Sequence, residues 1–370
     1  MKVAFQVDQL WFKAPGGIGT YVWQLSEALR KLEDGPELVT FRSSFPSDRV
    51  PWTVPMRGAD VILPLSPRIL YPSWAVVGRP RLPEALRSCD VVHATNHAAV
   101  PPVTRDKRLV VTVHDLAFLR FPELFPRAWR VQYRAALKAA IRRADRLLVP
   151  SQAVANDLTI RGAPEQRIRV TPLASGLPVG TADVREVLTR LRVARPYVLC
   201  AATIEPRKNQ ARLVRAYRRV ASEVPHALVL AGPAGWHGGE LEKELAGPGP
   251  GRIIRLGRLE RADLDAVIRG ADAVVYISIY EGFGLPLLEA MARGIPVLTS
   301  DLSALPEVAG EVALLVDPTD EDAVTDALRQ LLTDAQLRVD LSRRGRDRAA
   351  GFSWEATARA TLDAYREVLA

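Results

Sequence analysis

The stretch "AVVYISIYEGFGLPLLEAMARGIP", residues 273–296, joins an apolar run to a helix-like segment through a glycine-rich loop. The first six residues are continuously apolar, which is typical of a parallel strand buried on both faces. Pro286 suits the first turn of a helix, and Gly294 suits its end. The stretch therefore predicts a strand, a loop and a helix, the repeating unit of an α/β fold.

Similar apolar runs alternate with amphipathic segments along the rest of the chain, for example the helical patterns at 18–31 and 208–222. This alternation predicts an α/β fold with parallel sheets. Segment 169–196 interrupts it, and the first half of this segment, which carries several prolines and glycines, reads as a linker. We therefore expect two Rossmann-like domains, with a boundary near residue 175 and a ligand cleft at the carboxyl ends of the strands. The strand-like runs lie at 2–7, 37–41, 90–95, 108–115, 146–151, 197–202, 226–232, 252–257, 273–278, 296–300 and 313–317.

The composition is that of a globular protein. The 370 residues include 50 Lys and Arg against 42 Asp and Glu, giving a net charge of +8. Such an excess suits nucleic acid, an anionic membrane or phosphorylated small molecules, but no nucleic-acid-binding motif is present. Cys89 and Cys200 predict two buried thiols rather than a disulfide or zinc site. Without a signal peptide or a membrane-spanning run, a cytoplasmic location is expected.

Region 45–83 is rich in proline and carries Trp52, Tyr71 and Trp74. Two interpretations remain open. The region is an ordinary excursion between strand–helix units, or its aromatic side chains are exposed near an acceptor or at a membrane surface.

Two candidate sites lie in the first half of the chain. In "PGGIGTYVWQLSEAL", from Pro15, Gly16 and Gly17 open a helix whose amides could bind an anion. A dinucleotide fingerprint is incomplete, because Val22 stands where its third glycine belongs. In "VTVHDLAF", His114 follows a strand and could bind a sugar hydroxyl or a phosphate. The stretch "VVHATNHAA" offers weaker candidates: His93, Asn96 and His97.

Two more candidate sites lie in the second half. In "AATIEPRKNQARLV", Arg207 and Lys208 stand at a turn that enters a helix, which suits a pyrophosphate. In "EGFGLPLLEA", Glu281 precedes the predicted helix and Glu289 lies about one turn inside it. Glycines between them would let a ligand approach the backbone amides. Two carboxylates at different depths, with free amides between them, suit a sugar nucleotide.

Taken together, these motifs resemble the retaining glycosyltransferases of family four, which have the GT-B fold of two Rossmann-like domains facing across a cleft. The resemblance covers nearly the whole chain. It rests on the glycine loop (Gly16, Gly17, Gly19), His114, the Arg207–Lys208 turn and the E-x7-E spacing of Glu281 and Glu289, followed by "AMARGIPVLTSDLSALPEVAG". Within the family, the motifs most resemble those of mannosyltransferase-type members of polysaccharide pathways.

The resemblance implies transfer of a hexose from a nucleotide-diphosphate sugar to a saccharide or lipid-linked acceptor, with retention and without a metal. Residues 1–175, with a returning helix at 353–370, would bind the acceptor, and 176–352 would bind the donor. Catalytic roles fall to Glu281, Lys208, Arg207 and His114. Donor binding falls to Gly16, Gly17, Thr203, Arg258, Leu259, Leu264, Phe283, Gly284, Leu285 and Glu289, with Glu289 on the ribose and 257–264 against the base.

The motifs leave the phosphate contacts, the donor and the reaction class undecided. Ala202 stands where many family members carry an arginine, which leaves the division of phosphate contacts undecided. GDP-mannose is the favoured donor, and a UDP-sugar is the alternative. Asp263 and Asp265 resemble a metal-binding D-x-D, but a helix would point them apart, so they are read as helix surface. Alternatives are an epimerase or phosphorylase, a non-catalytic sugar-nucleotide-binding protein and, more weakly, an NAD-linked enzyme.

Overall fold

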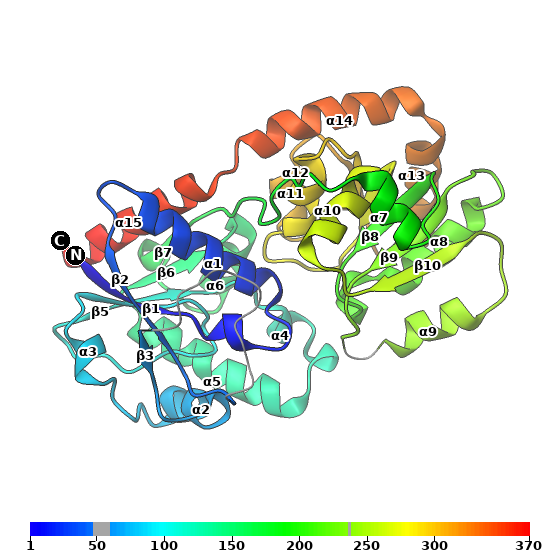
Figure 1. Ribbon diagram of the computed structural model, residues 1–370. Coiled ribbons are helices and arrows are strands. Elements are labelled where there is room, and N and C mark those ends of the chain that lie inside the picture. The colour runs from blue at the N-terminus through cyan, green and yellow to red at the C-terminus, as the bar shows by residue number, and fades with distance from the viewer. Residues whose placement is uncertain (47–59, 236–237) are drawn as a thin grey trace. The chain divides into compact units, whose positions relative to one another are not determined.

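The computed structural model describes residues 1–46, 60–235 and 238–370. The chain divides into two compact units, drawn in Figure 1: unit 1 comprises 1–176 and 353–370, and unit 2 comprises 177–352. The division lies one residue from the boundary placed in the linker. Each unit holds one sheet, and every paired strand in both sheets is parallel. The predicted α/β fold class with two parallel sheets is confirmed.

Unit 1 contains a seven-stranded sheet with the order β3-β2-β1-β4-β5-β6-β7. Its strands are β1 (Lys2–Gln6), β2 (Glu37–Arg42), β3 (Val61–Ile62), β4 (Val91–Ala94), β5 (Arg108–Thr112), β6 (Arg146–Val149) and β7 (Ile168–Val170). Its α-helices are α1 (Gly16–Lys31), α2 (Pro67–Val76), α3 (Glu84–Arg87), α4 (Ala117–Arg120), α5 (Arg127–Arg143), α6 (Gln152–Ile160) and α15 (Trp354–Leu369). Short 3₁₀ helices are η1 (Asp8–Trp11), η2 (Pro122–Leu124) and η3 (Glu165–Arg167).

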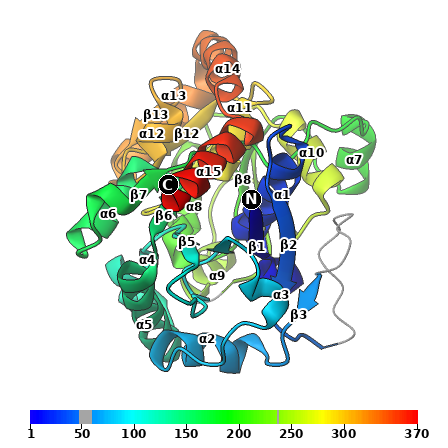
Figure 2. The same cartoon turned by 90° about the vertical axis from the view of Figure 1, so that its left-hand side faces the viewer.

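Helices cover both faces of this sheet. On one face, α2, α3, α5 and α6 contribute to a buried apolar cluster with the strands. Helix α15, from the far end of the chain, packs against α1, and Figures 1 and 2 show the two side by side. A buried chain of hydrogen bonds fixes α15 to the sheet: Tyr365 Oη lies 2.6 Å from His93 Nδ1, and His93 Nε2 lies 2.8 Å from Thr112 Oγ1. The expected return of the C-terminal helix to the first unit is therefore present.

Unit 2 contains a six-stranded sheet with the order β10-β9-β8-β11-β12-β13. Its strands are β8 (Tyr197–Ala201), β9 (Ala227–Ala231), β10 (Ile253–Gly257), β11 (Ala273–Tyr276), β12 (Val297–Ser300) and β13 (Leu314–Val316). Its helices are α7 (Val184–Arg190), η4 (Pro206–Lys208), α8 (Gln210–Val220), α9 (Gly239–Ala246), α10 (Arg261–Gly270), α11 (Leu285–Met291), α12 (Leu305–Ala309), α13 (Glu321–Thr333) and α14 (Ala335–Ala350).

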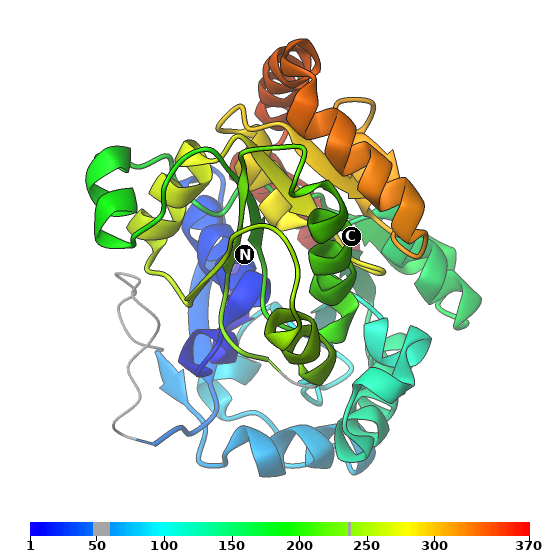
Figure 3. The ribbon, with the colours of Figure 1, turned by 90° about the vertical axis from the view of Figure 1, so that its right-hand side faces the viewer.

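The helices of unit 2 also form two layers. Helix α8 packs against α9 and α13, and these helices share an apolar cluster with the strands. On the other layer α10 packs against α7, and α11 packs against α14. Figure 3 shows the strands between these layers, with α14 in orange. Because the inner strands β8, β9, β11 and β12 are covered on both faces, their apolar residues are continuous rather than alternating.

Two strands, β3 and β7, were not predicted from the apolar runs in the sequence. Strand β3 has only two residues, and β7 lies inside the segment read as the start of the linker, with an exposed Arg169 at its centre. Both occupy sheet edges, where a strand needs less apolar surface than a central one.

Of the two interpretations of region 45–83, the exposed aromatic surface is wrong for the part that the structure describes. Tyr71 and Trp74 lie on α2 and are 7% and 1% exposed, because α2 packs against α5. Trp52 lies outside the described residues. The buried thiols of Cys89 and Cys200 are as predicted. None of the helices in the described part of the chain has the length and apolar character needed to cross a membrane.

Candidate active site

Each sheet has one point where the strand order reverses: between β8 and β11 in unit 2, and between β1 and β4 in unit 1. Loops that leave neighbouring strands diverge at such a point and open a crevice at the carboxyl ends, where α/β proteins bind ligands. In unit 2, the loop after β8 carries Arg207 and Lys208, and the loop after β11 carries Glu281. The topology therefore brings together residues more than 70 positions apart.

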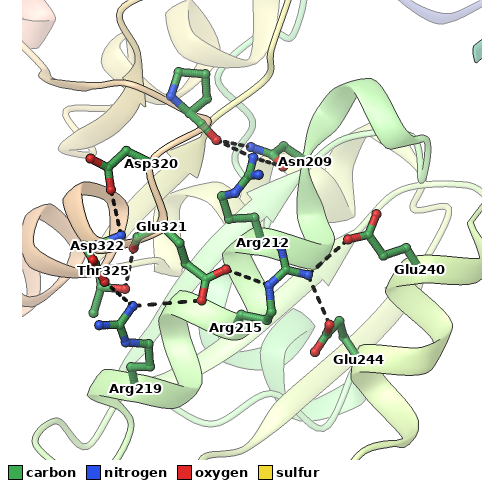
Figure 4. Close-up of polar contacts among 11 residues, drawn as sticks. Asn209, Arg212, Arg215, Arg219, Glu240, Glu244, Asp320, Glu321, Asp322 and Thr325 are labelled. Atoms are coloured by element: carbon green, nitrogen blue, oxygen red, sulfur yellow. Dashed lines mark hydrogen bonds and ion pairs between the residues drawn. The ribbon is translucent and has the colours of Figure 1, made fainter.

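A polar network of side chains at the start of α8 holds the turn after β8 in place. Asn209 adopts a left-handed conformation, with φ 60°, between the 3₁₀ turn η4 and helix α8. Its side-chain amide donates to the carbonyl of Pro318 over 2.7 Å, and Arg212 donates to the same carbonyl (Figure 4). Further along α8, Arg215 is within 3.1 Å of Glu321, Glu240 and Glu244. Arg207 and Lys208 lie in η4, and α8 begins at Gln210, two residues later than the predicted helix start at 208.

Glu281 is the centre of the cluster in unit 2, and it is 7% exposed. Its Oε1 accepts from Lys208 Nζ at 2.5 Å and from Tyr276 Oη at 2.9 Å. Its Oε2 lies 3.1 Å from Arg207 Nη1. These cations lower the pKa of Glu281 to about 2, against a burial effect that acts in the opposite direction. The Glu281 carboxylate is therefore ionised at every ordinary pH.

Glu205 is a member of this cluster that the sequence analysis missed. It is 4% exposed and accepts from Arg207 Nη2 at 2.6 Å. Arg207 also donates to the carbonyl of Tyr280 at 2.7 Å, so its guanidinium joins the two loops. The signal was present in the sequence, because Glu205 precedes Pro206 in the same turn as the two cations. Four charges, two of each sign, therefore share one buried site.

Glu289 lies one turn inside α11, as predicted, but in different surroundings. Its backbone carbonyl accepts from Arg293 Nη1 at 2.8 Å, whereas no bond to its carboxylate is found among the described residues. Burial raises the pKa of this carboxyl to about 7, although the charges of Arg293 and Arg261 partly oppose the rise. Arg261 begins α10, so Glu289 lies near the segment expected to contact the base. Its carboxylate is available to a ligand.

Glycine at position 284 is required by the backbone. Gly284 has a φ of 108°, which L residues avoid, and a Cβ there would lie 2.7 Å from Leu305. It allows the loop to turn directly into α11, whose first residue is Leu285.

The other residues of unit 2 that were predicted to contact the donor differ in how far they are buried. Phe283 is 5% exposed and packs edge-on against Phe352, with ring centroids 6.0 Å apart, so its ring is a core element. Thr203 follows β8 and its carbonyl accepts from Gln210. Arg258 is exposed beyond the end of β10, whereas Leu259 and Leu264 are half-buried.

The interpretation of Asp263 and Asp265 as helix surface is wrong for Asp265. Asp265 is 1% exposed and lies 2.6 Å from Arg293, whose side chain is fully buried. Arg293 also donates to the carbonyls of Leu177 and Pro178, at the start of unit 2. Asp263 points away and pairs with Arg190. Nowhere in the described ranges do three or more His, Cys, Asp or Glu side chains form a group able to hold a metal.

In unit 1, the glycine loop lies beyond the end of β1 and His114 lies beyond the end of β5. Gly16 has a φ of 58° and a Cβ there would meet open space, whereas Gly17 continues the first turn of α1. His114 Nε2 lies 2.8 Å from the carbonyl of Thr95. A carbonyl only accepts, so Nε2 carries the proton and Nδ1 is left as an acceptor. Burial lowers the pKa of His114, which keeps the ring neutral.

The two weaker histidine candidates differ. His93 is fully buried in the hydrogen-bond chain to α15, so its role is structural. His97 is 7% exposed and stacks on Phe118, with ring centroids 5.5 Å apart. Neither of its ring nitrogens finds a hydrogen-bond partner within the described ranges. Asn96 uses its side chain to accept from the amide of Ala98.

Comparison with known proteins gives a consistent result. The family model "Glycosyltransferase Family 4" matches residues 15–174, and the model "Glycosyl transferases group 1" matches 189–348. The O-antigen chain mannosyltransferase B of Escherichia coli is 31% identical over 383 residues, which cover 99% of this chain and all of that protein. The chain belongs to glycosyltransferase family 4. The resemblance drawn from its motifs is confirmed.

Solved structures share the fold at lower identity. The sucrose-phosphate synthase of Thermosynechococcus elongatus superposes with a TM-score of 0.74 at 21% identity, covering 100% of this chain and 99% of that one. The HepE protein of Anabaena, in complex with UDP and glucose, gives a TM-score of 0.74 at 18% identity, covering 99% and 100%. These identities support the fold alone. Glycosyltransferase activity follows from the family and from the mannosyltransferase relative.

Proposed function

We propose that this family 4 enzyme transfers a hexose, mannose in the first instance, from a nucleotide-diphosphate sugar to a saccharide or lipid-linked saccharide, with retention at the anomeric carbon. The observation that carries the proposal is the cluster of Lys208, Arg207 and Glu281 at the switch point of unit 2, with the Glu289 carboxylate one turn into α11. The nearly full-length mannosyltransferase relative supports the choice of mannose. The UDP-bound structural neighbour keeps a UDP-sugar as the alternative to GDP-mannose.

Glu281 and Glu289 would hold opposite ends of the donor. Glu281, ionised and held from two sides, would accept hydrogen bonds from hydroxyls of the transferred sugar. Glu289 would accept from the ribose diol, while residues 257–264, including Arg258, Leu259 and Leu264, would contact the base. Gly284 and Leu285 would offer backbone amides, and Thr203 a hydroxyl.

In the reaction, the bond between the anomeric carbon and the β-phosphate oxygen breaks, and the electron pair leaves with the diphosphate. The acceptor oxygen bonds to the same face of the anomeric carbon, and its proton passes to the departing phosphate oxygen. The Lys208 ammonium would stabilise the negative charge that develops on the leaving diphosphate. A preorganised cation of this kind can lower the activation barrier substantially. Arg207 is held by Glu205, Glu281 and the Tyr280 carbonyl, so it would fix the geometry and supply a static positive field.

Unit 1 would supply the acceptor side. The neutral His114 ring has Nδ1 available to accept from a sugar hydroxyl, and His97 offers a second buried ring nearby. Gly16 and Gly17 at the start of α1 would meet the donor phosphate. Metal independence, a cytoplasmic location and a peripheral membrane contact of unit 1 are further parts of the proposal.

The deciding experiment has two steps. A thermal-shift screen with GDP-, UDP-, ADP- and dTDP-sugars identifies the donor, because a ligand that binds only the folded state raises the midpoint. Transfer from that donor to mannose-containing acceptors is then followed by NMR, which reads the anomeric configuration, with and without EDTA. An inverted product would exclude retention, loss of transfer in EDTA would exclude metal independence, and epimerised donor without an acceptor would favour an epimerase.

A further inference from the structure

A cavity of about 350 Å³ lies in unit 1 at the amino-terminal ends of β4 and β5. Segment 78–82, between α2 and α3 in Figure 2, forms one wall, and residues 102–107, just before β5, form the other. Leu82, Leu86 and Val92 supply its apolar lining. The candidate site of unit 1 lies beyond the carboxyl ends of the same strands. Five residues of β5 separate the two regions, a span of about 15 Å.

The cavity lining is strongly cationic. Arg79, Arg81, Arg87, Arg105 and Lys107 line it, and no carboxylate is found in its lining among the residues that the structure describes. Arg87 pairs with Glu84 at 2.6 Å, and Lys107 lies 3.9 Å from Asp106. Arg79, Arg81 and Arg105 make no ion pair with any acidic residue in the described ranges. Three exposed arginines without an ion-pair partner in those ranges therefore line one concave site.

Hydrogen bonds from α2 hold one wall of the cavity in place. Ser73 Oγ donates to the carbonyl of Arg79 at 2.6 Å, and Trp74 Nε1 donates to the carbonyl of Pro80 at 3.0 Å. On the opposite wall, the Lys107 amide donates to the carbonyl of Thr104 at 3.1 Å and closes a turn. A site with a fixed backbone loses less entropy on binding than one that must be ordered.

We propose that this cavity binds a phosphate-bearing ligand, at a site separate from the one that performs transfer. Guanidinium groups bind phosphate through paired N–H donors, and three of them more than neutralise the charge of about −2 of a phosphomonoester. The volume is in the range of small-molecule sites, so the ligand is larger than inorganic phosphate, with a carbon skeleton against Leu82 and Leu86. This site is not part of the transfer machinery of the proposed function, although a lipid ligand bound here would provide the peripheral membrane contact proposed for unit 1.

Two sources offer this chemistry: a soluble phosphorylated metabolite and the head group of an anionic phospholipid. Val76 and Val77 are 74% and 69% exposed, and they directly precede the wall of the cavity. Apolar side chains beside a basic site would enter the boundary of a bilayer if the phosphate belonged to a lipid. The experiment therefore needs one arm for each source.

The test compares the wild-type chain with Arg81→Ala/Arg105→Ala. Calorimetry with glycerol 3-phosphate serves the soluble arm, and cosedimentation with vesicles containing phosphatidylglycerol serves the lipid arm, with phosphatidylcholine vesicles as the neutral reference. We expect the double variant to bind its ligand at least about tenfold more weakly, since two charge-assisted contacts are removed. Arg81→Lys/Arg105→Lys should restore part of the binding.

The matched control is Arg161→Ala/Arg167→Ala, which removes the same charge elsewhere on unit 1. The control and Lys208→Ala should both bind like the wild-type chain. Selective loss of glycerol 3-phosphate binding supports a soluble ligand, and selective loss of vesicle binding supports a lipid. Absence of both in the wild-type chain, or equal loss in the arginine control, overturns the proposal. Donor binding measured in parallel reports on the transfer site, so a failure there is recognised separately.

Discussion

Glu281 and Glu289 lie eight residues apart in one loop and helix, yet their pKa values are shifted in opposite directions. That of Glu281 is lowered to about 2 by Arg207 and Lys208, whereas that of Glu289 is raised to about 7 by burial. Glu281 is therefore a fixed negative charge across the working pH range, and Glu289 changes its charge near neutrality. Environments that separate two carboxyl pKa values commonly assign them different roles.

The first prediction concerns Glu289→Gln. A carboxyl whose pKa is raised on folding stabilises the fold below its unfolded pKa of about 4.5, and that contribution is lost as the pH rises through 7. The unliganded Gln variant should therefore be more stable than wild type at pH 8, by about 1–2 kcal/mol, and the difference should shrink towards pH 5. Urea unfolding at several pH values measures this. A pH-independent difference would refute the assignment.

The second prediction concerns Lys208→Ala. Removing a cation directed at the leaving diphosphate should lower the transfer rate by about 10²–10³ while the fold is retained. Lys243→Ala, which removes an exposed lysine of α9, should have no effect. Arg207→Ala should also lower the rate, but this variant should still bind the nucleoside diphosphate more tightly than the nucleoside.

If Arg207→Ala and Lys208→Ala lose this difference in affinity equally, Arg207 is a direct phosphate ligand.

The third prediction compares two aspartates on α10. Asp265→Ala leaves the buried Arg293 guanidinium without its charge partner and should cost about 3–5 kcal/mol of unfolding free energy. Asp263→Ala breaks a half-exposed pair with Arg190 and should cost less than about 1 kcal/mol. Calorimetric midpoints of unit 2 give the comparison. Similar losses in the two variants would argue against the buried pair.

The fourth prediction compares two tryptophans of unit 1. Trp74 is 1% exposed, so Trp74→Ala should cost about 3–5 kcal/mol through the cavity it leaves. Trp129 is 45% exposed on α5, so Trp129→Ala should cost less than about 1 kcal/mol. A stable Trp74→Ala variant that had merely lost vesicle binding would favour the exposed aromatic surface, which is the other interpretation of this region.

The sequence by itself determined the fold class and most elements, because local patterns carry that information. Continuous apolar runs marked the central strands, and Pro286 and Gly294 marked the two ends of α11. The E-x7-E spacing placed Glu281 before the helix and Glu289 within it. Short edge strands such as β3 and β7 were missed, since an edge strand needs little apolar surface.

Tertiary structure alone decided what each side chain meets. Asp265 and Asp263 have the same sequence signature, but only Asp265 faces the buried Arg293, which lies in the turn after α11. Tyr71 and Trp74 looked exposed until α5 covered them. The opposite pKa shifts of the two glutamates depend on cations 73 and 74 residues away in one case and on burial in the other. Burial and charge act through space, and the order of strands in the sheet sets which residues meet.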